Sequence, residues 1–267
     1  MLKDITLGQY FPIDSFLHKL DPRTKILLFI LDIVAIFVAK SVFSYAVLIA
    51  FTFFVMLISK VPVKMYIKGL KPILFIIIFT AVLNLFLTKG TDLPVFGYSI
   101  GITVEGVIVA AKMAIRLILL IIGSSALTYT TSPMALTDAI EKLLKPLSRI
   151  GFPTHELAMM MSIAIKFVPT LIEETDKIIK AQQARGASFD TGSIFKRAKA
   201  LIPMLVPLFI SAFRRADELA VAMESRCYAG GDGRTRLREI KFSKKDIFGW
   251  LVAILFLVAA LSLDILF

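Results

Sequence analysis

Long apolar runs, separated by short charged segments, dominate the hydrophobic pattern of this chain. The longest run covers residues 26–58, which are 33 positions with Asp32 and Lys40 as the only charges. A single helix of that length would measure about 50 Å, whereas the hydrocarbon layer of a bilayer is about 30 Å thick. We therefore predict a break at Lys40–Ser41 and two short antiparallel spans. Further spans are predicted at residues 72–88, 104–129 and 248–267.

The composition agrees with an all-α integral membrane protein of about five transmembrane helices. Of the 267 residues, 57% are hydrophobic, and the mean hydropathy of +0.81 exceeds what a soluble domain shows. Cys227 is the only cysteine, so no intrachain disulfide or thiolate metal cluster is expected. His18 and His155 lie outside any metal-ligand spacing, so no metal site is predicted. The N-terminus does not have the pattern of a cleavable signal peptide.

The distribution of charge predicts the orientation in the membrane. The net charge is +11, and 19 of the 31 Lys and Arg lie within residues 132–246. No nucleic-acid-binding motif accompanies this charge, so we attribute it to the excess of Lys and Arg in cytosolic segments and expect no nucleic acid as partner. With the N-terminus inside, a second basic segment also faces the cytosol. It carries lysines at a spacing that suits one edge of an interfacial helix: Lys60, Lys64, Lys68 and Lys71.

Two features lie on the other side of the membrane in this topology. Residues 89–101 are Gly- and Pro-punctuated with a single lysine, so we predict a polar outer loop. Lys40 also falls outside and is the only basic residue that disagrees with the rule. The fourth span should begin after Thr103, an N-cap residue, with Glu105 in the first turn, where the helix dipole favours an acid.

The cytosolic region reads as three helices. Ser132 supplies an N-cap for an amphipathic helix that Pro146 should kink or end early. Longer helical patterns follow at residues 155–185 and 194–228, and both become polar toward their ends. We interpret them as helices along the membrane face, and the alternative is that 157–172 and 201–213 enter the membrane. The expected domains are 1–131 with four spans, 132–246 as a cytosolic helical region, and 247–267 as the last span.

The two long helices end alike, with an arginine between small residues. Small neighbours leave a guanidinium unobstructed, and its donors suit a partner's carboxylate. The alternative is that each arginine only compensates the dipole at the helix C-terminus. These candidate docking residues are Ala184, Arg185 and Gly186 in the first helix, and Ser225, Arg226 and Cys227 in the second.

Charged residues inside the spans form a second group of candidates, since a charge in hydrocarbon is costly. Asp32 and Arg116 could form an ion pair between the first and fourth spans, or they could line a pathway for a substrate. The chain has no phosphate-binding loop, zinc-protease motif or nucleophile elbow, so we do not expect an enzyme.

Most of the chain resembles the EcfT family, the transmembrane component of energy-coupling factor (ECF) transporters, which includes CbiQ-like proteins. The similar stretches are DSFLHKLDPRTKI (14–26), GITVEGVIVAAKMAIRLIL (101–119), TSPMALTDAIEKLLKPLSRIGFP (131–153), KFVPTLIEETDKIIKAQQARGASF (166–189) and FRRADELAVAMESRCY (213–228).

The resemblance implies a non-catalytic subunit in the cell membrane that couples two cytosolic ABC-type ATPases to a membrane-embedded substrate-binding S component. Arg185 and Arg226, each with its small neighbours, would dock in the two ATPases, which would bind ATP and magnesium while this chain binds no cofactor. The flanking residues of Arg226 depart from the Ala-Arg-Gly form that Arg185 matches. The substrate, a vitamin or metal micronutrient, would be chosen by the S component. A stand-alone carrier, with Asp32 and Arg116 lining its pathway, is the alternative function.

Overall fold

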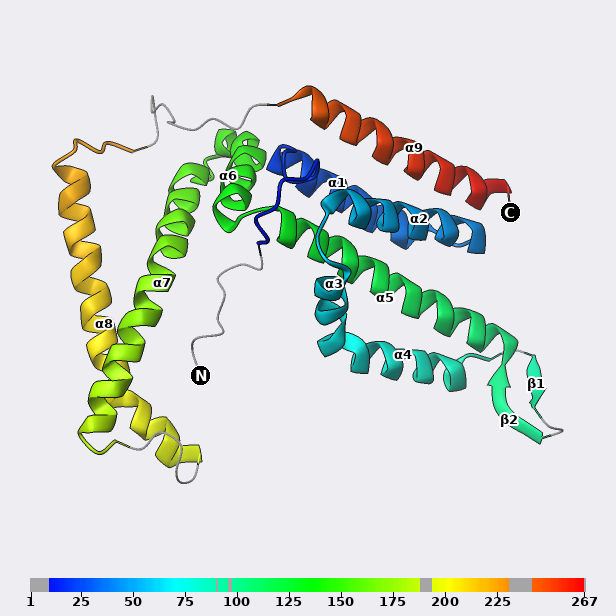
Figure 1. Cartoon of the computed structure of the whole chain (residues 1–267), viewed down its shortest axis with the longest axis horizontal. Coiled ribbons are helices and arrows are strands. Elements are labelled where there is room, and N and C mark those ends of the chain that lie inside the picture. Colours follow the sequence, from blue (N-terminus) through cyan, green and yellow to red (C-terminus); the bar gives the residue numbers. More distant parts are fainter. Residues whose placement is uncertain (1–9, 90, 96–97, 188–193, 231–241, 267) are drawn as a thin grey trace. The chain divides into compact units, whose positions relative to one another are not determined.

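The computed structural model describes residues 10–89, 91–95, 98–187, 194–230 and 242–266 (Figure 1). The chain divides into two compact units, which we call the membrane unit, Gly8–Ala139 with Ile240–Phe267, and the coupling unit, Ile140–Glu239. The helices of the membrane unit are α1 (Pro22–Val38), α2 (Val42–Ser59), α3 (Val63–Leu70), the 3-10 turn η1 (Lys71–Ile73), α4 (Leu74–Leu87), α5 (Val104–Thr130) and α9 (Lys244–Leu266). Helix α6 (Pro133–Leu144) begins there, and η2 (Lys145–Ile150), α7 (Thr154–Ala184) and α8 (Ile194–Glu224) follow in the coupling unit.

The predicted break in the longest apolar run is confirmed. Helix α1 ends at Val38, and α2 begins at Val42 behind Ser41, whose hydroxyl accepts the N–H of Phe43 as an N-cap. The other predicted helix starts are also confirmed: Thr103 caps α5 by accepting from Gly106, and Ser132 caps α6 by accepting from Ala135. Local side-chain chemistry therefore sets these boundaries.

The set of helices that could cross a membrane differs from the prediction by one member. Five stretches in the described part of the chain are long and apolar enough: Val42–Ser59, Val63–Leu87, Val104–Thr130, Thr154–Ala184 and Lys244–Leu266. Helix α1 has 17 residues, about 25 Å at the usual rise, and is one residue shorter than α2, the shortest of these five. Helix α7 is among the five because its first half is apolar, although its second half carries the charges that favoured a cytosolic position.

The predicted outer loop at 89–101 is instead partly an antiparallel hairpin, which contains the only strands in the described residues. Strand β1 (Asp92–Val95) pairs with β2 (Tyr98–Thr103), and Val95 lies opposite Tyr98 (Figure 1). Pairing satisfies backbone groups that an open loop would leave to water. The sequence did not indicate it because both strands are short and contain the proline or glycine that we interpreted as loop signals.

Small residues allow the helices of the membrane unit to pack closely. Helices α1, α2, α5 and α9 lie side by side (Figure 1), and their shared core includes Ala35, Ala39 and Ala260 around Ile36 and Leu48. In a bilayer, helices associate through close packing rather than through release of water, so alanines at the contacts favour association. Many other large apolar side chains of the unit point outward, as Phe75 of α4 does with an exposed fraction of 76%.

Charged side chains from neighbouring helices satisfy the helix ends of this unit. Near the end of α9, Asp264 accepts the backbone N–H groups of Lys40 and Ser41 at 2.9 and 2.6 Å and the hydroxyl of Ser44 at 2.8 Å. From α1, the buried Lys25 donates to the carbonyl of Thr130 at 2.8 Å, at the last residue of α5. An anion thus lies at the start of one helix and a cation at the end of another, as the helix dipoles favour.

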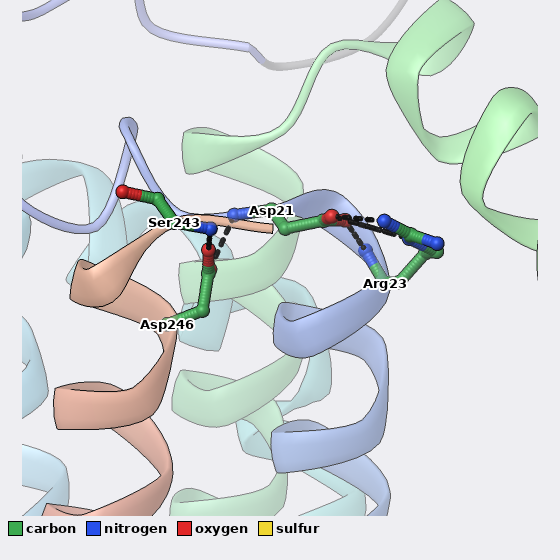
Figure 2. A network of polar contacts seen from close by, with 4 residues as sticks. All are labelled: Asp21, Arg23, Ser243 and Asp246. Atoms are coloured by element: carbon green, nitrogen blue, oxygen red, sulfur yellow. Dashed lines mark hydrogen bonds and ion pairs between the residues drawn. The ribbon is translucent and has the colours of Figure 1, made fainter. Parts of the chain in front are cut away.

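Asp246 joins the starts of α9 and α1. One carboxylate oxygen accepts the N–H of Ser243 at 2.7 Å, three residues earlier in a capping-box arrangement, and the other accepts the N–H of Asp21 at 2.7 Å (Figure 2). Asp21 in turn caps α1 through the N–H of Arg23 and forms an ion pair with its guanidinium at 2.6 Å. Asp246 is fully buried. This carboxylate therefore ties the start of α9 to the start of α1.

This role of Asp246 predicts a specific loss on substitution. In Asp246→Asn, one oxygen is replaced by an amide NH₂ that faces an N–H group, so one buried donor loses its acceptor. We expect the free energy of unfolding to fall by about 1–3 kcal/mol, measured by thermal unfolding in detergent micelles. Asp14→Asn is the control, because Asp14 makes only an exposed ion pair with Lys19 at 3.6 Å. Equal melting temperatures for the two variants would contradict the role of Asp246.

Candidate partner-docking site

Helices α7 and α8 run antiparallel in the coupling unit and are joined by polar contacts. Glu174 of α7 accepts the hydroxyl of Ser211 and pairs with the guanidinium of Arg215 at 2.9 Å. Eight residues later on α7, Gln182 contacts Pro203, eight residues before Ser211 on α8. This opposite progression fixes the antiparallel register, and Figure 1 shows the two helices side by side. Sequence reasoning did not identify Glu174, Ser211 or Arg215, because only the fold brings them together.

A proline in α8 explains why Gln182 is needed. Pro207 has no N–H, so the carbonyl of Pro203, four residues earlier, lacks its usual helical donor. The side-chain amide of Gln182 donates to this carbonyl at 3.3 Å. The helix-breaking residue therefore creates a contact point for the neighbouring helix, and α8 continues through both of its prolines, Pro203 and Pro207.

Helix α7 ends in a Schellman motif that its own backbone completes. Gly186 has a φ of +87° and donates its N–H to Gln183, while Ala187 donates to the carbonyl of Gln182 at 3.0 Å. Arg185 is therefore the C-cap residue, and its side chain is exposed. Gly186 thus occupies the C′ position.

Helix α8 ends in the same motif with a cysteine in place of the glycine. Cys227 has a φ of +54° and donates to Glu224 at 2.9 Å, and Tyr228 donates to Met223 at 3.0 Å. Arg226 thus occupies the position that Arg185 has in α7, and it is also exposed. Because backbone bonds alone satisfy these last carbonyls, neither arginine side chain is required to complete its helix end.

The two arginines lie at opposite ends of the helix pair. The antiparallel register places Arg226 level with a residue about 26 positions before Arg185, so the two ends are roughly 40 Å apart along the pair at about 1.5 Å per residue. They cannot converge on one small ligand. They present two equivalent but separate features to macromolecular partners.

An exposed apolar stripe follows α8 away from its contact with α7. Its members recur at the spacing of one helix face, and Phe209, Ile210 and Phe213 are 60–68% exposed. A face of this size is unlike an ordinary soluble surface and is typical of contact with lipid or with another membrane protein. The stripe consists of Leu201, Ile202, Leu205, Val206, Phe209, Ile210 and Phe213.

The structure does not bring Asp32 and Arg116 together, so the ion pair expected from the sequence is not formed. Arg116 donates to the hydroxyl of Tyr45 at 2.9 Å and lies 5.4 Å from the ring centre of Phe37. Asp32 instead lies against Gly123, seven residues further along α5, where an added Cβ would be 3.0 Å from its carboxylate. Seven residues correspond to about 10 Å of helix, too far for a salt bridge.

Comparison with known proteins identifies the family. A family model described as "Cobalt transport protein" (CbiQ) matches residues 14–237. The chain is 54% identical, over the full length of both proteins, to the energy-coupling factor transporter transmembrane protein EcfT of Ruminiclostridium cellulolyticum. It is 57% identical to EcfT of Clostridium kluyveri, covering 95% and 94% of the two chains, and 45% identical to EcfT of Bacillus subtilis, covering 92% and 93%. The chain belongs to the EcfT family.

An EcfT chain is a multi-pass transmembrane subunit of an energy-coupling factor transporter and not an enzyme. The prediction made from the resemblance and from the missing catalytic motifs is therefore confirmed. The alternative of a stand-alone carrier with Asp32 and Arg116 along its pathway loses its support, since this family forms part of a larger transporter and the two side chains are separated.

The positive φ at both helix ends predicts that replacing the glycine of α7 lowers local stability and that introducing a glycine in α8 raises it. Gly186→Ala places a Cβ at a positive φ, where open space surrounds it, so only backbone strain should cost stability, about 1 kcal/mol. Cys227→Gly should remove such strain and stabilise its end by about 0.5–1 kcal/mol. Amide hydrogen exchange of Ala187 and Tyr228 measures the two ends separately, and a change of 1 kcal/mol is about fivefold in rate. Effects of the same sign at both ends would contradict the shared motif.

Proposed function

We propose that this EcfT chain is the energy-coupling subunit that joins two cytosolic ABC-type ATPases to a membrane-embedded, substrate-binding S component. The observation that carries this proposal is the pair of equivalent helix ends with exposed arginines at opposite ends of one helix pair. Two equivalent features suit two related partners, as a pair of ATPase subunits would be. The docking residues would be Ala184, Arg185 and Gly186 for one ATPase, and Ser225, Arg226 and Cys227 for the other.

Arginine suits this role for physical reasons. Its planar guanidinium has five donors and remains charged, so it can bind a carboxylate of a partner in a bidentate manner. The small neighbours, together with the sharp turn of the Schellman motif, leave room for a partner's surface to approach. This chain has no phosphate-binding loop, so ATP and magnesium would be bound in the ATPases, and this subunit would hold no cofactor of its own.

The rest of the coupling unit would transmit movement to the S component. The exposed stripe on α8 offers an apolar face to a membrane-embedded partner, and the contacts of Glu174 and Gln182 hold α7 to α8, so that a displacement at one arginine reaches both helices. ATP binding would stabilise one of two arrangements of these helices. The substrate would be a vitamin or metal micronutrient selected by the S component.

The proposed topology places the N-terminus and the coupling unit in the cytosol. The excess of Lys and Arg in residues 132–246 supports it through the positive-inside rule. The helix pair α1 and α2 would then cross and return, Lys64 would face the cytosol, and Lys89 would face outward.

Reversing both docking charges tests the ATPase contacts. We expect Arg185→Glu combined with Arg226→Glu to abolish co-purification of the ATPases from native membranes, because a carboxylate on the partner would then meet a carboxylate. Since both side chains are exposed, the melting temperature of the subunit should not change. The matched control is Lys166→Glu with Lys180→Glu, which reverses two other exposed charges on α7. Normal complex yield from the arginine variant would refute the docking assignment.

Single cysteines test the topology. In a Cys227→Ser background, which has no other cysteine, we expect Lys89→Cys to react with a membrane-impermeant maleimide in intact cells. Lys64→Cys should react only after the cells are permeabilised. Both native side chains are exposed, so accessibility is not limited by packing. The reverse pattern would show that the orientation is inverted.

A further inference from the structure

Helix α3 presents a row of lysines between α2 and α4. Lys64, Lys68 and Lys71 fall within an arc of about 60° at the angular spacing of an α-helix, and Lys60 precedes them in a left-handed turn with a φ of +57°. All four side chains are exposed. None of the four ammonium groups has an ion pair within the residues that the structure describes. The prediction that these lysines share one edge of a helix is confirmed for Lys64, Lys68 and Lys71 but not for Lys60, which ends α2, and the four charges are uncompensated within the described residues.

The opposite face of α3 is fixed to the membrane unit. Tyr66 is 1% exposed, its hydroxyl lies 3.0 Å from that of Ser59, and its ring packs edge-on against Tyr129. The hydroxyl of Tyr129 also donates to the carbonyl of Met65 at 3.1 Å. Gly69 lies so close to Tyr129 that an added Cβ would be 3.3 Å from its hydroxyl. The lysines are therefore held in place by a packed helix rather than carried on a free loop.

Beside the lysine edge, α3 exposes an apolar edge. Val63 and Ile67 are 56% and 60% exposed, and their angular positions lie between the lysines and the buried face. Helix α4 follows with the exposed Leu74 and Phe75, and the stretch from α3 to α4 is long and apolar enough to cross a membrane. A helix with adjacent basic and apolar edges at the start of a span is typical of the boundary between headgroups and acyl chains.

We propose that α3 is a binding site for anionic phospholipid headgroups, formed by Lys60, Lys64, Lys68 and Lys71, with Val63 and Ile67 against the acyl chains. The inference rests on the proposed topology, which places this edge at the cytosolic leaflet. Four uncompensated positive charges, three along a fixed helix and one in the turn before it, match the phosphate of an anionic lipid, and the apolar edge matches its chains. A soluble protein partner would match the lysines but would leave the apolar edge without its complement.

Native mass spectrometry of the full chain in neutral detergent, titrated with phosphatidylglycerol or phosphatidylcholine, tests the site. Wild type should bind phosphatidylglycerol more tightly than phosphatidylcholine. Each lysine near an anionic surface contributes about a fivefold factor in affinity, so Lys64→Gln with Lys68→Gln should weaken phosphatidylglycerol binding by about 25-fold. Lys64→Arg with Lys68→Arg should retain binding, because the charge is kept. The matched control, Lys177→Gln with Lys180→Gln on α7, removes the same charge from exposed positions elsewhere and should leave binding unchanged.

Three results would overturn the proposal. These are equal binding of the two lipids by wild type, equal affinity of the α3 variant and the α7 control, and loss of ATPase co-purification in the α3 variant with unchanged lipid affinity. The last result would assign the edge to a protein partner. Because Arg185→Glu with Arg226→Glu leaves α3 intact, its lipid binding should equal that of wild type whether or not the ATPases dock at these arginines. Failure of the lipid site is therefore distinguishable from failure of the docking assignment.

Discussion

The membrane unit depends on one constraint, which is that helix ends near hydrocarbon must find hydrogen-bond partners within the protein. Charged residues of neighbouring helices supply them. Asp264 satisfies the turn before α2, Lys25 satisfies the end of α5, and Asp246 satisfies the starts of both α9 and α1. Each charge thus does two things, since it completes a helix end and fixes one helix to another. The positions of the helices follow from where their ends are capped, and alanines at the contacts then allow close packing.

In the coupling unit, the ends of the long helices are satisfied without side chains from neighbouring helices. The ends of α7 and α8 are completed by their own backbone, so Arg185 and Arg226 are not consumed in capping. Within the pair, prolines free a carbonyl, and Gln182 of the neighbouring helix binds it. The result is a helix pair with an exposed arginine at each end that is not used in capping. Such a pair can bind partners at its ends, and its neighbours can change while both helices keep their structure.

Helix α3 has one face tied to the membrane unit and one edge with exposed charges. Its inner face is tied to the membrane unit through Tyr66, while its lysines, like the two arginines, have no partner among the described residues that compensates their charge. Exposed basic residues beside an anionic leaflet are attracted to it, by about 1 kcal/mol per residue near the surface. The arginine ends and the lysine edge can therefore be understood together as places where this subunit meets its surroundings, a protein partner in one case and a lipid surface in the other.

The sequence alone determined the helices, most of their boundaries and the family. Apolar length, the caps at Ser41, Thr103 and Ser132, and the glycine after Arg185 act over a few residues, and such local signals can be read from the order of residues. Tertiary structure decided what depends on distant residues meeting: the hairpin after α4, the capping of α1 by Asp246, the Glu174 contacts, and the separation of Asp32 from Arg116. The expected ion pair between Asp32 and Arg116 is not formed because the sequence shows which charges lie in the spans but not their depths along the helix bundle. These depths depend on how neighbouring helices are placed against one another, and the capping contacts that fix this placement form only in the folded chain.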